Sequence, residues 1–281
     1  MARPAPARGS YDPHAAHRDF ESEVARLRAQ ALVTWPKEAA RLEGYGLRDG
    51  MSVLEIGCGP GFVTRELLGR WPSLKVTGLE LDADLARQAR KLNRRAGQRV
   101  RVVEGSILDA GLRDNRFDFA IARLVFQHLP DPLVAAREAF RVLKPGGKLV
   151  VVDVDDALWG IADPALPELA PVLRKAAGAQ SERGGNRLIG RRLHRLLLAA
   201  GFVDPDLDAV VGHSDQLGLE PFRANLDADR FRPLVEQGLL EETDVATARA
   251  AYERFLGSPA PFLLTLYLVA CGAKPRRTRR S

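Results

Sequence analysis

The segment from Met51 to Trp71 constrains the fold more than any other part of this sequence. It begins with a short apolar run, Met51–Ile56, which contains one acidic residue, Glu55, and an amphipathic stretch begins at about Phe62. Between them stand three glycines at alternate positions, Gly57, Gly59 and Gly61. Glycine accepts positive φ and has no Cβ to hold a ligand away from the backbone. A strand, a glycine turn and a helix start in this order predict a nucleotide-like ligand beside the turn.

Short apolar runs and amphipathic stretches alternate along the chain as far as residue 154. A helical pattern over 19–43 comes first, and the Trp35-Pro36 pair divides it into two helices. The alternation predicts an α/β fold, in which a mostly parallel sheet carries helices on both faces. The expected strands are 53–56, 75–79, 100–104, 117–122 and 148–154, and the expected helices between them are 62–71, 83–95 and 131–143.

The alternation fails after residue 154. The stretch 155–185 is irregular, with one expected helix near 167–178, and we interpret it as an insertion over the edge where the strands have their C-terminal ends. The remaining expected elements are the helices 188–200, 219–235 and 241–256 and the strands 203–211 and 262–271. Two strands are therefore left to complete the sheet, together with helical insertions that cover it.

The composition is that of an ordinary globular protein. Apolar residues make up 46% of the 281 residues, which is enough for a sizeable core. No uncharged apolar run reaches about 18 residues, so a transmembrane helix is not expected, and the N-terminus lacks the apolar region of a secretory signal. Cys58 and Cys271 lie far apart and form no metal-binding or disulfide pattern. These features predict a reduced, cytoplasmic protein.

Most of the net charge of +6 lies in the tail 274–281. This tail carries five basic residues and no acidic one. Without it the chain is nearly neutral, so we interpret the tail as a solvated, mobile end. Nucleic acid is therefore not an expected partner.

Four features around the glycine turn narrow the choice of cofactor. Glu80 ends the second expected strand, 23 residues after Gly57, where a carboxylate can accept hydrogen bonds from ribose hydroxyls. Glu55 stands at the end of the first strand, where it could meet a cationic group. The third strand ends in Glu104-Gly-Ser-Ile107, and a Leu143-Lys-Pro-Gly-Gly147 turn precedes the fifth. Each feature alone is shared by other nucleotide-binding proteins.

Together with the Phe117-Asp118 pair, these features resemble the class I S-adenosylmethionine-dependent methyltransferase family, and in particular its small-molecule members. The resemblance covers residues 19–154. It implies a Rossmann-like sheet of seven strands, in which the last strand, 262–271, lies antiparallel beside the fifth. It also implies S-adenosylmethionine as the cofactor and methyl transfer as the reaction.

The resemblance further implies a cofactor site. Glu55 would lie near the amino group of the cofactor, Glu80 on the ribose hydroxyls and Leu81 against the adenine. Ser106 stands where the family commonly has Asp, and its hydroxyl could still bind the adenine amino group. An N-terminal helix resembles the lid that covers the cofactor in many small-molecule members. The implied cofactor-binding residues are Arg26, Gln30, Glu55, Gly57, Cys58, Gly59, Gly61, Glu80, Leu81, Ser106, Ile107, Arg123 and His128.

Methyl transfer from a sulfonium ion is an in-line displacement with a neutral leaving group, so the enzyme mainly positions a nucleophile and excludes water. His128, after the fourth strand, is the predicted catalytic base for an oxygen acceptor, although it could instead only pack under the cofactor. Asp155, Asp156 and His213 are the alternative bases. Tyr11, in the N-terminal segment, is the second predicted catalytic residue and would close over the donor methyl group.

The acceptor is predicted by exclusion. No Asn/Asp-Pro-Pro-Tyr/Phe motif follows the fourth strand, where amino-directed nucleic-acid methylases carry one. The acidic residues at 153, 155 and 156 are too close in sequence for a three-carboxylate metal site. We therefore expect a metal-independent enzyme with a small organic acceptor, such as a natural product, a quinone or a lipid-like molecule.

Three other functions remain as alternatives. One is a tRNA or protein methyltransferase that uses the basic tail, and another is a protein that binds S-adenosylmethionine without catalysis. The third is a nicotinamide dehydrogenase, which the Leu143–Gly147 turn does not support.

The expected organisation is a disordered N-terminal segment, a methyltransferase domain and a basic disordered tail. Their boundaries are 1–18, 19–273 and 274–281, respectively. Within the domain, 19–50 is expected to form a helical lid, and 155–185 and 215–258 are expected to form cap insertions that enclose the acceptor. The sequence leaves the oligomeric state open, with a homodimer as one option.

Overall fold

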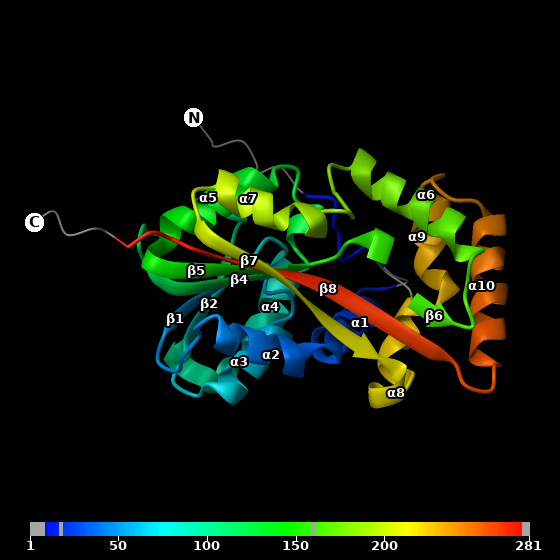
Figure 1. Cartoon of the computed structure of the whole chain (residues 1–281), viewed down its shortest axis with the longest axis horizontal. Helices are drawn as coiled ribbons and strands as arrows, with labels where there is room; N and C mark the ends of the chain where they lie inside the picture. The colour runs from blue at the N-terminus through cyan, green and yellow to red at the C-terminus, as the bar shows by residue number, and fades with distance from the viewer. Residues whose placement is uncertain (1–8, 17–18, 159–160, 277–281) are drawn as a thin grey trace, which may run out of the picture.

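A mixed sheet forms the centre of the molecule and carries helices on both faces (Figure 1). The computed structural model describes residues 9–16, 19–158 and 161–276, and within these the sheet has eight strands. The strands are β1 (Ser52–Ile56), β2 (Lys75–Glu80), β3 (Val100–Glu104), β4 (Phe117–Arg123), β5 (Leu143–Asp153), β6 (Ile161–Asp163), β7 (Val203–His213) and β8 (Phe262–Ala273). The α-helices are α1 (Phe20–Val33), α2 (Trp35–Gly44), α3 (Phe62–Arg70), α4 (Ala83–Leu92), α5 (Pro132–Val142), α6 (Leu169–Glu182), α7 (Leu193–Ala199), α8 (Ser214–Leu217), α9 (Arg232–Glu236) and α10 (Glu242–Leu256). The 3₁₀ helices are η1 (Arg94–Arg99), η2 (Ile107–Asp109), η3 (Phe126–His128), η4 (Asp156–Leu158), η5 (Gly190–Arg192), η6 (Glu220–Asn225) and η7 (Ala228–Phe231).

The strand order is β3-β2-β1-β4-β5-β8-β6, with β7 paired to β8. Pairing is parallel from β3 to β5, and β8 is antiparallel to β5, β6 and β7. The predicted Rossmann-like sheet with an antiparallel last strand beside the fifth is therefore confirmed. The strand beyond the predicted seven is β6, which pairs with the beginning of β8. It has three residues, too few for an alternating pattern to mark it in the sequence.

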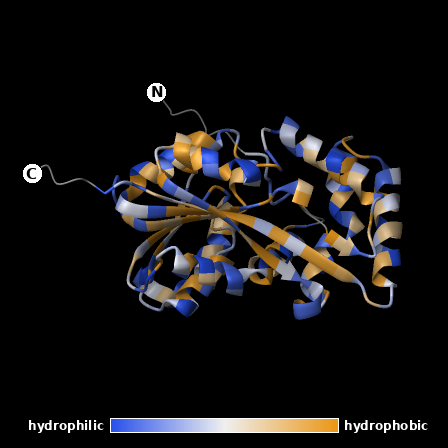
Figure 2. Cartoon of the chain, in the orientation of Figure 1, coloured by the Kyte–Doolittle hydropathy of each residue, from blue (hydrophilic) through white to orange (hydrophobic). Residues whose placement is uncertain are grey.

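The central strands are buried on both faces, so they read in the sequence as continuous apolar runs. In β4, Ala120 and Ala122 join one core, whereas Phe119 and Ile121 join the other, because successive side chains point to opposite faces of a sheet. Helices α5 and α7 cover the first core, and α2 and α3 cover the second (Figure 1). Figure 2 shows the apolar residues concentrated along these central strands.

Helices α6, α9 and α10 form a cap beyond the end of the sheet at which β8 begins (Figure 1). The cap has its own apolar core, in which Phe222, Phe231 and Phe255 are buried. The single helix predicted over 219–235 is wrong, because this stretch is divided into η6, η7 and α9. Prolines stand in the first turns of η6 and α9, where they begin a helical segment but cannot continue one. Among the described residues, every helix is too short or too polar to span a bilayer.

Both ends of the described chain are held against the domain. Residues 9–16, which the sequence analysis places in a disordered segment, pack beside the end of β4. The backbone N–H of Ser10, a buried residue, donates to the carbonyl of His128 at 2.9 Å. At the other end, Lys274 Nζ donates to backbone carbonyls at the end of α5. The remainder of the two predicted disordered ends, 1–8, 17–18 and 277–281, lies outside the described residues.

Candidate active site

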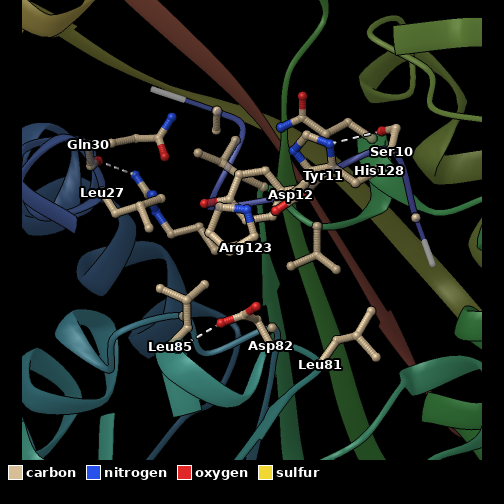
Figure 3. Close-up of a pocket in the computed structure, with 18 of the residues that line it drawn as sticks. Ser10, Tyr11, Asp12, Leu27, Gln30, Leu81, Asp82, Leu85, Arg123 and His128 are labelled. Atoms are coloured by element: carbon tan, nitrogen blue, oxygen red, sulfur yellow. Dashed lines mark hydrogen bonds between the residues drawn. The ribbon is translucent and has the colours of Figure 1, made fainter. Parts of the chain in front are cut away.

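A cavity of about 1050 Å³ lies at the C-terminal ends of the parallel strands. Its lining comes from the loops after β1 to β4, from residues 9–16 with α1, and from the cap around α6 and α9. An open α/β sheet usually binds its ligands at this edge. Figure 3 shows part of the lining, with Ser10, Tyr11, Asp12, Leu27, Gln30, Leu81, Asp82, Leu85, Arg123 and His128.

Every predicted site residue except Gly61 lines this cavity. Gly61 stands immediately before α3 with a φ of 83°. A Cβ at this position would lie 2.5 Å from Nδ2 of Asn93 and 3.0 Å from Ala89. Gly61 therefore permits close packing of α3 on α4, and the structure places it behind the site.

Of the three alternative bases, one lines the cavity and two do not. Asp156 lines the cavity and accepts two hydrogen bonds from Arg187, at 2.8 and 2.7 Å. Asp155 instead pairs with Arg191, and neither of these two residues lines the cavity. His213 is also absent from the lining. Asp156 is thus the one alternative that the fold brings to the site.

The glycine turn exposes backbone to the cavity. Its residues Gly57 and Gly59 have φ values of 65° and 52°, in the left-handed region. A Cβ on Gly57 would lie 2.5 Å from Val125 Cγ2, whereas a Cβ on Gly59 would meet nothing within 4 Å. Gly57 is therefore required for packing, and Gly59 leaves an open face beside the main chain. This face fits a cofactor that approaches the backbone closely.

Two buried carboxyl groups stand at the ends of β1 and β2. Glu80 accepts backbone N–H groups from Gly59 at 2.7 Å and from Asp82 at 3.0 Å, so it ties the glycine turn to β2. Burial raises the pKa of Glu80. Glu55 accepts a hydrogen bond from the hydroxyl of Thr64 in α3, and burial raises the pKa of Glu55 to about 8. Glu55 therefore holds a proton at neutral pH unless a cation lies beside it.

The loops after β2 and β3 form an apolar wall. Leu81 lines the cavity and is 42% exposed, so it offers apolar surface to a ligand. Ile107 belongs to the same wall. The hydroxyl of Ser106 accepts a hydrogen bond from Leu108 N at 3.2 Å, which leaves the hydroxyl proton available to a ligand.

Comparisons with known proteins decide the family. Residues 54–151 match the family model described as a methyltransferase domain. An uncharacterised 37.1 kDa protein of a Streptomyces fradiae transposon is 32% identical over 248 residues, which are 85% of this chain and 67% of that protein. Methyltransferase phqN of Penicillium fellutanum is 31% identical over 202 residues, which are 69% of this chain and 57% of that protein. The chain belongs to the class I S-adenosylmethionine-dependent methyltransferase family.

The fold of this methyltransferase agrees with solved structures. Haemonchus contortus phosphoethanolamine N-methyltransferase 2, in complex with S-adenosyl-L-methionine, superimposes with a TM-score of 0.56 at 19% identity. The match covers 86% of this chain and 53% of that one, so this methyltransferase spans just over half the length of the Haemonchus and Penicillium proteins. At this identity the structural likeness concerns the fold. The bound S-adenosyl-L-methionine belongs to the Haemonchus protein.

The two N-terminal helices of the methyltransferase are fastened to the sheet by Arg123. The predicted break is confirmed, because α1 ends at Val33 and α2 begins at Trp35. Arg123, at the end of β4, donates from Nε to Glu38 in α2 at 2.8 Å and from Nη2 to the carbonyl of Gln30 in α1 at 2.8 Å. Arg123 lines the cavity, but its guanidinium is committed to these partners, so it holds α1 and α2 against the end of β4.

Residues 9–16 are fastened to α1 through one carboxylate. Glu23, which is fully buried, accepts two hydrogen bonds from Arg26 at 2.7 and 2.6 Å and one from the hydroxyl of Tyr11 at 2.6 Å. Burial and the negative charge of Glu23 raise the pKa of Tyr11. The phenol of Tyr11 is therefore neutral and its proton is engaged, while its ring lies 5.2 Å from the ring of His128.

His128 is held as a neutral imidazole. Its Nδ1 lies 3.1 Å from the hydroxyl of Ser10 and 3.3 Å from Nε2 of Gln180, and this amide nitrogen also donates to the carbonyl of Gln127. An amide nitrogen only donates, so Nδ1 is the acceptor and Nε2 carries the proton. Burial, assisted by the positive charge of Arg187, lowers the pKa of His128 to about 3. This arrangement offers a hydrogen-bond donor, and it does not favour the predicted role of His128 as a base.

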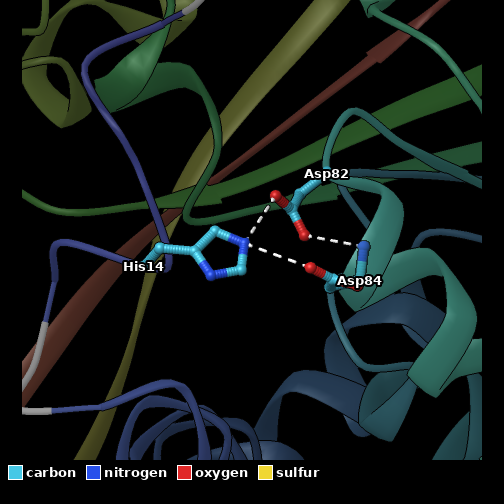
Figure 4. A group of neighbouring side chains, drawn as sticks. All are labelled: His14, Asp82 and Asp84. Atoms are coloured by element: carbon cyan, nitrogen blue, oxygen red, sulfur yellow. Dashed lines mark hydrogen bonds and ion pairs between the residues drawn. The ribbon is translucent and has the colours of Figure 1, made fainter.

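A second contact fastens residues 9–16 to the loop after β2. The Nε2 atom of His14 lies 3.4 Å from carboxylate oxygens of Asp82 and Asp84 at the start of α4 (Figure 4). One ligand atom from each of the three residues lies within 4.8 Å of the others, a spacing that could hold a metal ion. The other oxygen of Asp82 caps α4 by accepting backbone N–H groups of Asp84 and Leu85. The contact of His14 with Asp82 and Asp84 therefore connects residues 9–16 with the loop after β2.

Sequence reasoning expected the cap insertions to enclose the acceptor, but apart from Asp156 it named none of the residues that they contribute to the lining. Gln180 and Arg183 from α6 and its C-terminal end, Arg187 from the following loop and Arg230 from η7 line the cavity. No helical or strand periodicity distinguishes these residues from their neighbours. The local sequence Arg183-Gly-Gly-Asn-Arg187, a glycine pair between two cations, is the one signal that could have indicated a ligand loop.

Proposed function

We propose that this methyltransferase transfers the methyl group of S-adenosylmethionine to a small organic acceptor without using a metal ion. The observation that carries the proposal is the extent of the cavity. The glycine turn, the end of β4 and the cap helices line one space of about 1050 Å³. Pockets that enclose small-molecule ligands in other proteins reach about 1000 Å³. The cofactor and an acceptor of modest size would share it.

The proposed cofactor half extends from the glycine turn to the loop after β3. The open backbone at Gly59 would carry the methionine and ribose portions. Glu80 would accept the ribose hydroxyls through lone pairs that its backbone donors leave free. Leu81 and Ile107 would pack against the adenine, and Ser106 would bind its edge. Burial raises the pKa of the neighbouring Cys58 thiol, which suits a packing residue and not a nucleophile.

Glu55 is the proposed partner of the cofactor's ammonium group. Its carboxyl is buried at the end of β1 and lines the cavity. A hydroxyl, and not a cation, donates to it from α3. A bound ammonium group would restore the charged form that burial disfavours.

When bound, S-adenosylmethionine supplies a methyl group on a sulfonium sulfur. The chain's own residues would then position the acceptor and exclude water, which are the main requirements of an in-line displacement. Ser10 and Tyr11 cover the cavity from the N-terminal segment. Neutral His128 would bind the acceptor by donating from Nε2, and Tyr11 would position this imidazole through ring contact.

Calorimetric titration with S-adenosylhomocysteine tests the cofactor half. Glu80→Ala should weaken binding about tenfold or more, because hydrogen bonds to a charged group are lost. Glu104→Ala is the matched control, since Glu104 ends the neighbouring strand β3, pairs with Arg90 at the surface and does not line the cavity. Gly59→Val, which leaves Glu80 in place, should also abolish binding. Wild-type affinity in both site variants would contradict the assignment.

Methyl transfer to a panel of acceptors tests the acceptor half. Conversion of S-adenosylmethionine to S-adenosylhomocysteine should depend on a small organic acceptor and should persist in excess EDTA. Turnover only with tRNA or protein, or loss of turnover in EDTA, would contradict the proposal.

A further inference from the structure

His14, Asp82 and Asp84 bring three metal-ligating side chains together beside the wall of the cavity (Figure 4). Within the part of the chain that the structure describes, no other group of three or more His, Cys, Asp or Glu residues has ligand atoms close enough to hold an ion. His14 belongs to the N-terminal segment, whereas the two aspartates stand at the start of α4. The fold, and not a local sequence motif, therefore assembles the group.

The distances within this group are too long for good hydrogen bonds. Nε2 of His14 lies 3.4 Å from Oδ2 of Asp82 and 3.4 Å from Oδ2 of Asp84. A charge-assisted hydrogen bond from a nitrogen to a carboxylate is about 2.7–2.9 Å long. In a tetrahedral zinc site, bonds of about 2.0–2.2 Å place neighbouring ligand atoms about 3.3–3.5 Å apart. Both distances therefore match the edge of a zinc tetrahedron.

Each carboxylate has one oxygen committed to the protein and directs the other toward His14. Oδ1 of Asp82 accepts the backbone N–H groups of Asp84 and Leu85, at 3.0 and 2.9 Å. Oδ1 of Asp84 accepts a hydrogen bond from Nη1 of Arg87. In metal sites, contacts of this kind hold the ligands in the orientation that the ion requires. The two Oδ2 atoms are thus oriented as single-oxygen ligands.

The imidazole of His14 is also held by contacts outside the group. Its ring stacks on that of Phe20 at the beginning of α1, with the ring centroids 5.0 Å apart and the planes inclined by 14°. The backbone N–H of His14 donates to Oδ1 of Asp12 at 2.9 Å. Nε2 is thereby directed at both carboxylates, as Figure 4 shows.

The chemistry of the ligand set favours zinc among the common divalent ions. Zn²⁺ binds imidazole nitrogen and carboxylate oxygen, and a site with three protein ligands takes a water molecule as the fourth. Mg²⁺ and Ca²⁺ prefer oxygen ligands alone, in sites of six or more. The side chains of His14, Asp82 and Asp84 are 48%, 24% and 37% exposed, so water and the ion can reach them.

We propose that His14, Asp82 and Asp84 bind a Zn²⁺ ion, and that this ion fastens residues 9–16 over the cavity. His14 and Asp84 do not line the cavity, but their neighbours in the chain, including Pro13 and Ala83, do. The ion therefore joins two parts of the wall from outside and does not reach the reacting atoms. Methyl transfer continues without it, whereas a cofactor enclosed by residues 9–16 is bound more tightly with it.

Calorimetric titration of the full chain with zinc chloride, after treatment with EDTA and dialysis, tests the site. We expect one ion per chain and no comparable binding of magnesium chloride. His14→Ala and Asp84→Asn should each weaken zinc binding about tenfold or more, since loss of an outer-shell partner alone costs about 10- to 100-fold. Both side chains are partly exposed, so both variants should fold.

Two control variants match these changes. His194→Ala removes a histidine from α7, far from the group in the sequence. Asp131→Asn replaces a carboxylate that caps α5 by accepting the N–H groups of Leu133 and Val134, as Asp82 caps α4. Both variants should bind zinc as the wild-type protein does.

A second titration, with S-adenosylhomocysteine, tests the fastening of residues 9–16. Saturating zinc should tighten binding about fivefold or more in the wild-type protein, as is usual for two coupled ligands, and should have no effect in His14→Ala. Equal affinity with and without zinc in the wild-type protein would overturn this role.

The site itself is overturned if the wild-type protein binds no zinc, if magnesium binds equally well, or if His14→Ala or Asp84→Asn retains wild-type affinity for zinc. The zinc titration uses no cofactor, so its result is independent of the proposed function. Failure of S-adenosylhomocysteine to bind would instead overturn the proposed function, and with it the fastening role of the ion.

Discussion

Arg123 and Glu38 form a buried ion pair between the end of β4 and helix α2, with side chains that are 8% and 3% exposed. Glu38→Gln removes the negative charge and leaves a buried guanidinium without its counter-charge. We expect the free energy of unfolding to fall by about 3 kcal/mol, because an uncompensated buried charge is costly. Urea unfolding of the wild-type and variant proteins measures this difference.

The matched control is Glu43→Gln, in the last turn of α2. Glu43 pairs with Arg70 at 2.6 Å, but both side chains are about half exposed to solvent. Exposed pairs contribute little because water and salt screen them. A loss of stability in the control as large as that in Glu38→Gln would contradict the importance of burial for this pair.

Gly59→Ala should separate cofactor binding from backbone strain. Gly59 and Gly97 have φ values of 52° and 58°, and a Cβ on either would meet no atom within 4 Å. Alanine at Gly59 should cost about 1 kcal/mol of stability because of the positive φ. Alanine at Gly97 should cost more, because its positive φ is combined with a ψ of −131°, which L-residues avoid. Only Gly59→Ala should also weaken S-adenosylhomocysteine binding, as measured by calorimetry, because Gly97 lies outside the cavity lining. Equal affinity in the two variants would refute the proposed contact.

Cofactor binding should release a proton from Glu55. Burial raises the pKa of this carboxyl to about 8, so it is mainly protonated at pH 6.5. An ammonium group beside it would lower the pKa and expel the proton. The measurement is the dependence of the calorimetric binding enthalpy on the ionisation enthalpy of the buffer. Glu55→Gln should bind without proton release, and the same release in this variant would exclude Glu55 as its source.

The same carboxyl makes the unliganded protein less stable as the pH rises. Its folded-state pKa of about 8 exceeds the ordinary value of 4.5, so its stabilising contribution is complete below pH 4.5 and is lost as the pH rises through 8. His128 acts in the opposite direction, because its contribution is present above pH 6.5 and is lost as the pH falls toward 3. Between pH 7 and 8 the effect of Glu55 should therefore dominate. The unfolding temperature of the wild-type protein should fall as the pH rises across this interval. It should fall less in Glu55→Gln.

His14→Ala should accelerate the release of the cofactor. The contact of His14 with Asp82 and Asp84 helps to hold residues 9–16 over the cavity. The three side chains are partly exposed, and contacts between exposed charged groups contribute little energy. We therefore expect the dissociation rate to increase by about two- to fivefold. Stopped-flow displacement of S-adenosylhomocysteine measures the rate. His194→Ala in α7 should leave it unchanged, and an identical rate in both variants would argue against the contact.

The glycine-turn side of the cavity was predictable because its determinants are local. The glycine turn, Glu55 and Glu80 are placed by the ends of strands, and the apolar runs that form those strands are evident in the sequence. Parallel strands end at a common edge, so their terminal residues meet. The structure accordingly brings Glu80 to within 2.7 Å of the backbone N–H of Gly59.

The state of individual side chains was not predictable in the same way. Arg123 was expected at the cofactor, but its main partner, Glu38, lies 85 residues away in another element. His128 was expected to be a base, but its partners Ser10 and Gln180 come from the N-terminal segment and the cap. Partners so distant in sequence leave no periodic trace, and the cap that supplies many of them has no motif. Packing in three dimensions decides these contacts.

Strand β8 belongs to the sheet and also contributes Leu263 to the apolar core of the cap. This one strand of 12 residues pairs with β5 through its second half and with β6 through its first, while β7 accompanies it on the other side. A cap built on a continuous strand cannot swing outward as a separate body without breaking the ladder. We therefore expect ligand traffic to pass beneath residues 9–16. Under the proposed function, changes in the cap segments α6 and η6 to α9 would alter the acceptor while the glycine-turn side of the cavity stays the same.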